Sequence, residues 1–439
     1  MKFAHWVRER AFTAGTIDPA APLDDLEPLR ALIGNARVVA IGENSHHIRE
    51  FYLLRHRLLR FLVLRCGFSV YAFESPYVES ESLDHWVRGG RGDLAELTGT
   101  PAMSLTRCQD MHDTLTWMRE HNATAERPVR FAGTLAGNGG GSPLPELRRL
   151  RGRLERTDPD AIPLLDRALA GASSFHDDEP FRTFARYQAL DQSVRDALTA
   201  DLSRLLARSQ SMAAGRATPD DAMTYLRAAW FVDHLHRDMS GRGLAVGTAS
   251  LDAFMAESVL RRLDREPGTR IVLALHNVHI RTTPVEQDGP DGLFPAGYHL
   301  RDALGDDYVA IAATGNHGQV VSGEPDAEQP TGLRLVERAL PAPEPGSVET
   351  AFDTTAALTV ADLREADVDD AGTFSKFRSQ HEFLDAPVFE AFDAVAYLPR
   401  LSATDEFRRS VGSVRADYQE RQNTWGASTT CEATGSRST

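Results

Sequence analysis

The sequence predicts an α/β fold: a mostly parallel sheet sandwiched by helices, with a helical insertion lobe over the C-terminal strand ends. Short runs of β-branched and apolar residues recur along the chain, and each is followed by a turn and a helical pattern. This alternation is typical of βαβ units. The runs are almost continuously hydrophobic, as expected of strands that helices cover on both faces. Between about residues 143 and 243 the strand pattern stops, and Leu, Ala, Arg and acidic residues recur at helical spacing.

The strands are expected at residues 37–41, 70–73, 129–132, 271–275, 308–313 and 394–398. A helix is expected over residues 48–65, and the insertion is expected to hold three or four helices. The predicted organisation is therefore an α/β core made of residues 1–142 and 244–412, a helical insertion lobe of residues 143–243, and a flexible tail of residues 413–439. A length of 439 residues agrees with a core plus a large insertion rather than with one small domain.

Composition restricts the class of partner. Lys and Arg number 48 against 63 Asp and Glu, a net charge of −15, which disfavours binding nucleic acid through a basic surface. Three cysteines are too few for a disulfide framework. Neither a signal-peptide pattern nor a run of about 18 apolar residues occurs, so a cytoplasmic protein without a membrane partner is expected. The glycine-rich stretch at residues 137–142 lacks the spacing of a nucleotide-binding loop. We therefore expect a small-molecule substrate and no cofactor.

Titratable side chains follow three of the predicted strands. They are Glu43, His46 and His47 after the first strand, Glu74 after the second, and His276 with His279 after the fourth. Ligands of open α/β sheets bind at the carboxyl ends of strands. A single Glu or His in such a place is more often a cap or a surface residue, but three such ends together favour an active site.

Arg55 supports the same site. The helix expected over residues 48–65 has an apolar stripe that includes Phe51 and Leu58, and Arg55 falls inside this stripe. A buried guanidinium needs carboxylate partners, and Glu43 and Glu74 are the candidates. The alternative is that the long side chain reaches the surface.

A histidine beside one carboxylate, with a second carboxylate and a second histidine nearby, is a general acid–base set. No GxSxG motif supplies a nucleophilic serine. The residues therefore predict that a histidine activates water, or a substrate hydroxyl, for attack on a carbonyl, while Arg55 or the second histidine stabilises the oxyanion. The alternative is a metal site, because Glu43-x-x-His46 and His276-x-x-His279 contain four plausible ligands, although no HExxH motif is present. The favoured prediction has no metal, and His47 and His279 are expected to contact substrate.

Three segments resemble the erythromycin esterase family. They are GENSHHIRE from residue 42 with the following FYLLRHRLLRFLVLRCGFSVYAFES, then RIVLALHNVHIRTTP, and VFEAFDAVAYLPR near the C-terminus. The resemblance runs from about residue 38 to residue 400. It implies an α/β core with a helical lobe over the cleft, hydrolysis of a macrolide lactone in the antibiotic-resistance enzymes, and a metal-independent, water-activating mechanism. By this resemblance His46 is the general base, and Glu43, Arg55, Glu74 and His276 are its essential neighbours.

The chain departs from the family pattern at three places. His47 stands where the family usually has Gly, Thr134-Leu135 where a strand usually ends in Asp, and Leu251-Asp252 where an Arg-Asp pair is common. If these positions line the pocket, the substrate is a lactone or ester of another bulky natural product. Two alternatives remain open: a cyclase or dehydratase of natural product biosynthesis that uses the same residues, and a haem- or ligand-binding relative without turnover.

Overall fold

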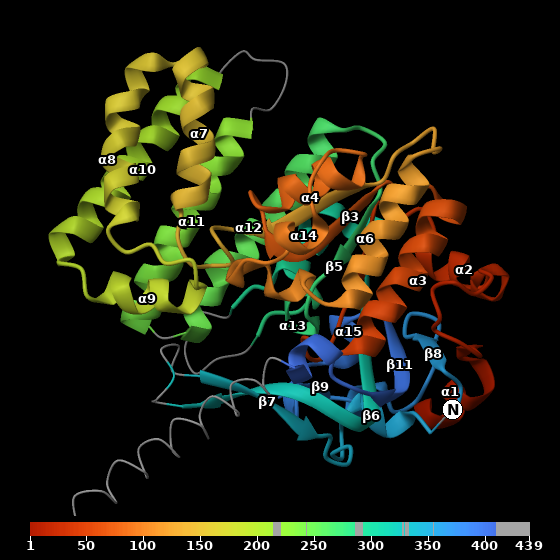
Figure 1. Ribbon diagram of the computed structural model, residues 1–439. Coiled ribbons are helices and arrows are strands. Elements are labelled where there is room, and N and C mark those ends of the chain that lie inside the picture. Colours follow the sequence, from red (N-terminus) through yellow and green to blue (C-terminus); the bar gives the residue numbers. More distant parts are fainter. Residues whose placement is uncertain are drawn as a thin grey trace, which may run out of the picture.

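The computed structural model describes residues 1–213, 221–242, 244–285, 293–326, 329, 333–353 and 355–409. Its centre is a nine-stranded sheet with the strand order β1-β8-β11-β6-β2-β5-β3-β4, with β7 paired to β6 (Figure 1). The strands are β1 (Phe12–Ala14), β2 (Val38–Ile41), β3 (Val70–Pro76), β4 (Arg130–Leu135), β5 (Ile271–Ala274), β6 (Tyr308–Pro325), β7 (Leu333–Ala339), β8 (Leu358–Asp362) and β11 (Ala394–Leu401). The tail predicted at residues 413–439 lies outside the described residues.

The sheet is mostly parallel, which confirms the predicted fold class. Strands β11, β6, β2, β5, β3 and β4 run parallel, and they correspond to the six predicted strands. Strands β1, β7 and β8 pair antiparallel and were not predicted. Nor was the separate hairpin of β9 (Lys376–Ser379) and β10 (Glu382–Asp385). β6 continues well past the predicted end at residue 313, through a segment whose glycines and polar residues are typical of a loop.

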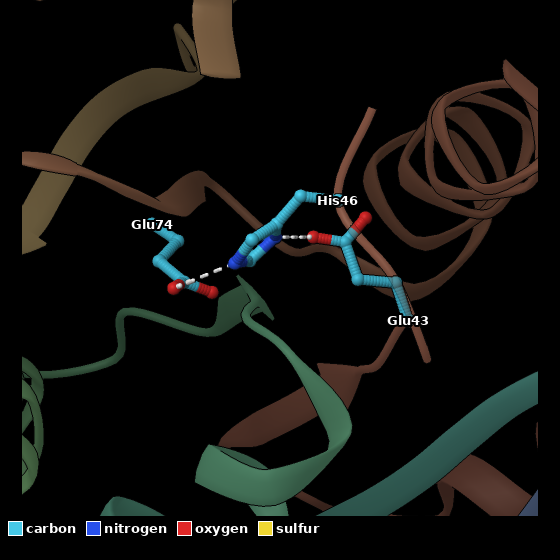
Figure 2. A group of neighbouring side chains, drawn as sticks. All are labelled: Glu43, His46 and Glu74. Atoms are coloured by element: carbon cyan, nitrogen blue, oxygen red, sulfur yellow. Dashed lines mark hydrogen bonds and ion pairs between the residues drawn. The ribbon is translucent and has the colours of Figure 1, made fainter. Parts of the chain in front are cut away.

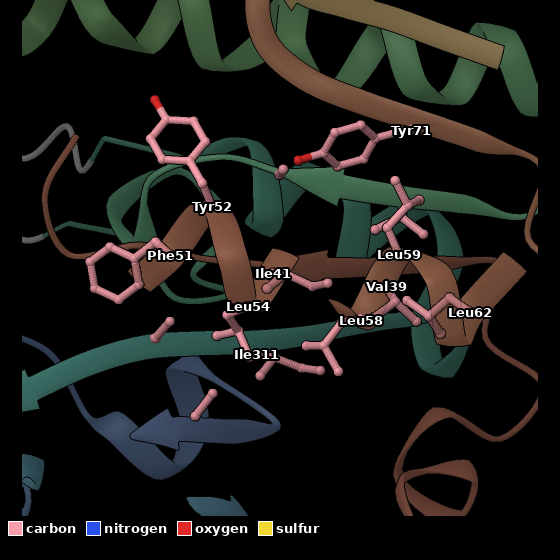
Figure 3. Packing of buried hydrophobic residues seen from close by; sticks show 14 of the residues in the cluster. Val39, Ile41, Phe51, Tyr52, Leu54, Leu58, Leu59, Leu62, Tyr71 and Ile311 are labelled. Carbon is pink, nitrogen blue, oxygen red and sulfur yellow. The ribbon is translucent and has the colours of Figure 1, made fainter. Parts of the chain in front are cut away.

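Helices cover both faces of this sheet because alternate strand residues point to opposite sides. Val39 and Ile41 of β2 pack with α3 (Arg49–Cys66) and α6 (Gln109–Asn122), as Figure 3 shows for α3. Val38 and Ala40 point the other way, into a second cluster with α1 (Phe3–Arg10), α12 (Leu244–Arg265) and α14 (Ala296–Leu304). The remaining helices of the core are α2 (Leu29–Ile33), α4 (Ser80–Val87), α5 (Leu94–Leu97), α13 (Asn277–Ile280) and α15 (Val388–Ala391).

The segment between β4 and α12 is helical. It contains α7 (Leu144–Thr157), α8 (Ile162–Ser173), α9 (Pro180–Gln188), α10 (Gln192–Ala213) and α11 (Asp221–Arg242). The described residues of this lobe thus hold five α-helices, and the prediction of three or four was wrong. The additional element is the short α9, which begins at a proline and is capped by Glu179.

The lobe packs against the carboxyl ends of β3 and β4 and extends to one side of the sheet (Figure 1). Ala136, which directly follows β4, is buried with Phe231 and Val232 of α11 and Phe254 of α12. Tyr77, which follows β3, lies edge-on to Tyr225, with ring centroids 6.1 Å apart. Among the described residues, no helix is both long and apolar enough to cross a membrane.

Candidate active site

Three neighbouring strands bring the predicted residues together. In the sheet β5 lies between β2 and β3, so the carboxyl ends of these three strands are side by side. Glu43 and His46 follow β2, Glu74 lies near the end of β3, and His276 follows β5 as the N-cap of α13. The three strand ends that the sequence singled out therefore form one site, although nothing in the sequence orders these strands.

The loop after β2 is held by Asn277, a residue that sequence analysis missed. The backbone N–H of Asn277 donates to the carbonyl of Glu43 at 2.8 Å, and its side-chain amide pairs with both backbone groups of Ala313 on β6. A Cβ at Gly42 would lie 1.9 Å from Asn277 Oδ1, so only glycine permits this approach. The glycine before Glu43 and the polar residue after His276 were the available signals.

Glu43 connects His46 to Arg55. His46 Nδ1 lies 2.8 Å from Glu43 Oε1, and Arg55 Nη1 lies 2.9 Å from Glu43 Oε2 (Figure 2 shows the histidine and the two glutamates). Burial alone would raise the pKa of Glu43, but Arg55 and His46 lower it to about 2. Glu43 is therefore a carboxylate at neutral pH, and it accepts a hydrogen bond from the Nδ1–H group of His46.

Arg55 is buried, as its place in the apolar stripe predicted. Its side chain is 1% exposed, and besides Glu43 it donates to the backbone carbonyls of Ile41 at 3.2 Å and Leu275 at 2.7 Å. Of the two predicted carboxylate partners it contacts Glu43. Because its nitrogens are directed to these protein acceptors, Arg55 is placed to orient Glu43 rather than to touch a substrate.

The other nitrogen of His46 faces Glu74. His46 Nε2 and Glu74 Oε1 are 3.7 Å apart, which is too long for a direct hydrogen bond. The His46 side chain is 33% exposed, whereas those of Glu43 and Glu74 are buried. Burial opposes the charged imidazole, but Glu74 and Glu43 outweigh it and raise the pKa of His46 above its usual 6.5. His46 thus has one nitrogen fixed and the other accessible.

His276 is a neutral ring with a defined tautomer. Its Nδ1 accepts a hydrogen bond from the backbone N–H of Val278 at 3.2 Å, so the ring proton is on Nε2. Burial, followed by the positive charge of His46, lowers the pKa of His276 to about 3. Nε2 is buried without a hydrogen-bond partner, and the ring centroid lies 5.3 Å from that of His46. The Nε2–H group of His276 therefore lies next to the partly exposed His46.

His279 lies between two carboxylates. Its Nδ1 is 2.7 Å from Asp252 Oδ1 on α12, and its Nε2 is 3.8 Å from Glu74 Oε1. Burial lowers the pKa of His279, but Asp252 and Glu74 raise it to about 9. Asp252 entered the sequence analysis only as part of a departure from the family pattern, because its 27-residue separation from His279 conceals the contact.

His47 lies beside the site in a strained backbone conformation. Its φ of 60° is in the left-handed region that favours glycine, and its ring stacks on Phe407 with centroids 5.4 Å apart. Its carbonyl accepts from the N–H of Thr404 at 2.8 Å. Of the other departures, Thr134 is buried and donates to the carbonyl of Phe73, and Asp252 contacts His279.

Three of these side chains also lie close enough together to be metal ligands. Glu43, His46 and Glu74 each offer one atom of a suitable type, and these atoms lie within 4.8 Å of one another. The predicted set of Glu43, His46, His276 and His279 does not form such a group within the described residues. Arg55 already forms an ion pair with Glu43, and Asp252 and Glu74 raise the pKa of His279, which faces Glu74, so a cation would compete with positive side chains at both carboxylates. These charges favour an acid–base site.

The fold gathers histidines and carboxylates at the carboxyl ends of parallel strands, which is an arrangement suited to general acid–base chemistry. The bond between Glu43 and His46 fits a catalytic pair and argues against a binding protein in which these two residues would be too far apart. The chain belongs to the erythromycin esterase family, whose model matches residues 63–401, and it is an esterase-type hydrolase. That match includes Glu74 and His276 but begins after Glu43 and His46.

Comparison with individual proteins extends the similarity over nearly the whole chain. The chain is 28% identical to erythromycin esterase type II of Escherichia coli, over 92% of this chain and 99% of the relative. It is 24% identical to erythromycin esterase type I of Escherichia coli, over 85% and 92% of the two chains. The structure resembles that of a mutant of the erythromycin esterase EreC in its open conformation, with a TM-score of 0.78 and 23% identity over 90% of this chain and 98% of the other.

Proposed function

We propose that the protein hydrolyses a lactone or ester of a bulky natural product, with His46 as the general base that activates water. The observation that supports this most strongly is the arrangement of the His46 ring. Nδ1 is fixed at 2.8 Å on Glu43, while Nε2 lies 3.7 Å from Glu74 Oε1 on a side chain that is one-third exposed. Because Nδ1 carries the ring proton, Nε2 is the nitrogen that can accept a proton from a water on the exposed side of the ring.

In the proposed reaction, His46 Nε2 takes one proton from this water as the water oxygen attacks the carbonyl carbon of the substrate. The new carbon–oxygen bond converts the carbonyl into a tetrahedral oxyanion. The protonated His46 then returns its proton to the leaving alcohol oxygen as the ester bond breaks. Glu43 stabilises the imidazolium that forms between the two steps, and Arg55 keeps Glu43 in place.

His276 is the proposed donor to the oxyanion. Of the two groups that the sequence suggested, Arg55 is directed to protein acceptors, whereas the Nε2–H of His276 has no partner. A buried donor without a partner costs about 1–3 kcal/mol, and a substrate oxygen would recover this energy. Because Nε2 is covered in the free protein, we propose that neighbouring side chains shift when the substrate enters.

The proposed substrate class rests on the relatives and on the surroundings of the site. The similar proteins from Escherichia coli are named erythromycin esterases, and erythromycin is a macrolide lactone. The helical lobe packs at the carboxyl ends of β3 and β4, and β3 is the strand that contributes Glu74. His47, partly exposed beside His46, is the proposed substrate contact of this side. Because the chain has His where the family usually has Gly, we propose a lactone or ester different from erythromycin.

The test is the activity of a His46→Asn variant against a panel of macrolide lactones and simpler bulky esters. We expect at least a roughly 10³-fold loss of kcat with unchanged thermal unfolding, because the base is removed and the buried pair of Glu43 and Arg55 remains. His234→Asn, a change of a partly exposed histidine on α11, is the control and is expected to keep full activity. A His46→Asn variant as active as the wild type would refute the proposal.

A further inference from the structure

The two nitrogens of His279 both face carboxylate oxygens. Asp252 Oδ1 lies 2.7 Å from Nδ1, and Glu74 Oε1 lies 3.8 Å from Nε2. The side chain of His279 is 14% exposed, and those of Asp252 and Glu74 are 8% and 7% exposed. Only the imidazolium presents an N–H on both nitrogens, so this environment selects the charged ring.

Asp252 is itself held in place from a second direction. Its Oδ1 accepts the backbone N–H of Ala296, the first residue of α14, at 2.9 Å, in addition to the His279 ring. Asp252 Oδ1, on α12, therefore bonds a residue of α13 and a residue of α14. The ring of His279 cannot turn away from Glu74 without breaking its short bond to this fixed oxygen.

Glu74 is shared between two histidines. Its Oε2 accepts the backbone N–H of His276 at 2.7 Å, which leaves Oε1 to face His46 Nε2 at 3.7 Å and His279 Nε2 at 3.8 Å. A positive charge on His279 offsets the negative charge of Glu74. Without it, the full charge of Glu74 would act on His46 and favour its protonated form, which cannot take a proton from water.

We propose that Asp252 is a positioning residue of this active site: it holds His279 as an imidazolium on Glu74, so that Glu74 orients His46 without trapping it in the protonated state. The inference rests on the proposed function for its catalytic consequence, but the charge state of His279 is a property of the protein alone. In this role His279 acts through Glu74 and not as the substrate contact expected from its position in the sequence.

The charge state of His279 is measured by nuclear magnetic resonance on protein labelled with ¹⁵N-histidine, with its signal assigned by its loss in His279→Gln. The titratable groups that face the ring are Asp252 on α12, Glu74 on β3, His276 on α13 and His46 after β2. We expect both ring nitrogens to stay protonated at pH 7.5, since the pKa of His279 is about 9. A neutral His279 at this pH in the wild type would overturn the proposal, whether or not the protein is active.

The variant Asp252→Asn removes the negative charge of the side chain and keeps its size. The amide oxygen of Asn can still accept from both His279 and Ala296, but the negative charge is lost. We expect the loss of this charge to lower the pKa of His279 by roughly two to three units, so that the ring is largely neutral where His46 titrates. We also expect the acid limb of kcat/KM to move to higher pH, because the negative charge of Glu74 then stabilises protonated His46 without a positive charge on His279 to offset it. A role of Asp252 in packing alone would leave both midpoints unchanged, and that result would refute the proposal.

Asp393→Asn is the matched control. The side chain of Asp393 is as buried as that of Asp252, at 8% exposed each, and it likewise accepts from a cationic side chain, Arg301, and from a backbone N–H, that of Ala310. It is expected to lower stability without moving either midpoint. Failure of the proposed function would show as absent hydrolysis with a protonated His279, whereas failure of this inference would show as hydrolysis with a neutral His279 or unshifted midpoints.

Discussion

Replacing Glu43 by Gln tests the proposed chemistry at a single atom. Glu43 uses two oxygens at once: Oε1 accepts from His46 Nδ1 at 2.8 Å, and Oε2 forms an ion pair with Arg55 Nη1 at 2.9 Å. Gln has only one oxygen. Arg55 is 1% exposed and always a donor, so the amide oxygen is expected to turn to Arg55 and the amide NH₂ to His46. His46 Nδ1 must then accept, which moves the ring proton to Nε2, the nitrogen that should take the proton from water.

The expected size of the effect follows from these contacts. An enzyme whose general-base histidine is held in the wrong tautomer loses kcat by a factor of about 10⁴, or about 5 kcal/mol in the barrier. Removing one partner from a buried ion pair costs about 3–5 kcal/mol of stability. Here Arg55 keeps the amide oxygen and two backbone carbonyls, so we expect a smaller loss of about 1–3 kcal/mol. The variant is thus expected to fold and to be nearly inactive.

The assay measures kcat and KM on the best substrate of the panel, together with thermal unfolding followed by circular dichroism. We expect kcat to fall and KM to stay close to the wild-type value, because Glu43 is buried and acts through His46 in the proposed reaction. Glu257→Gln is the control, since Glu257 also accepts from arginines, Arg227 and Arg261, at the junction of α11 and α12. A Glu43→Gln variant with kcat within about tenfold of the wild type would show that the tautomer of His46 does not matter.

Three further predictions concern the histidines. The acid limb of kcat/KM should have its midpoint above pH 6.5 and move lower in Glu74→Gln, because Glu74 raises the pKa of His46 and only the deprotonated ring is active; a midpoint below 6.5 in the wild type would contradict this. His276→Ala should lower kcat by roughly 10²–10³ with little change in KM, measured on the same substrate, as expected for a donor that acts on the oxyanion. His47→Gly should relieve about 1–2 kcal/mol of left-handed strain but lose the stacking on Phe407, so we expect nearly unchanged thermal unfolding and a KM that differs between large and small substrates; a uniform KM would argue against a substrate contact.

The side chains that meet in the candidate site could be predicted from local features of the sequence. Each strand end was predicted from an apolar run followed by a titratable residue. The burial of Arg55 was predicted from its position in the apolar stripe of α3. These signals depend on residues close together in the chain. The order of the strands, which makes the ends of β2, β5 and β3 neighbours, depends on packing between distant segments and was not predictable.

The contacts that were missed come from tertiary packing. Asp252 lies on α12, and only the packing of this helix against α13 brings it to His279. Arg57, on α3, is fully buried because residues 18–25 fold over it, and Asp25 and three backbone carbonyls accept its hydrogen bonds. In the sequence it differs little from any other charged residue of a helix.

The strands of the fold likewise divide into those that have a local signal in the sequence and those that do not. Six strands were predicted from continuous apolar runs, because both of their faces are covered. Strands β9 and β10 are only four residues long, and β7 alternates apolar and polar residues (LRLVERA), so none of the three has a continuous apolar run. Their pairing is set by register with neighbours, as in the ladder between Gln319 and Ala339 at the start of the β6–β7 pair.

Incorporation of oxygen from water tests the central claim most directly. The protein is incubated with the lactone or ester that it turns over in H₂¹⁸O, and the product is examined by mass spectrometry. We expect one labelled oxygen in the carboxylate of the product with the wild type, and no product with His46→Asn. Product formed without label would show intramolecular attack or elimination, as in a cyclase or dehydratase, and would contradict the activation of water by His46.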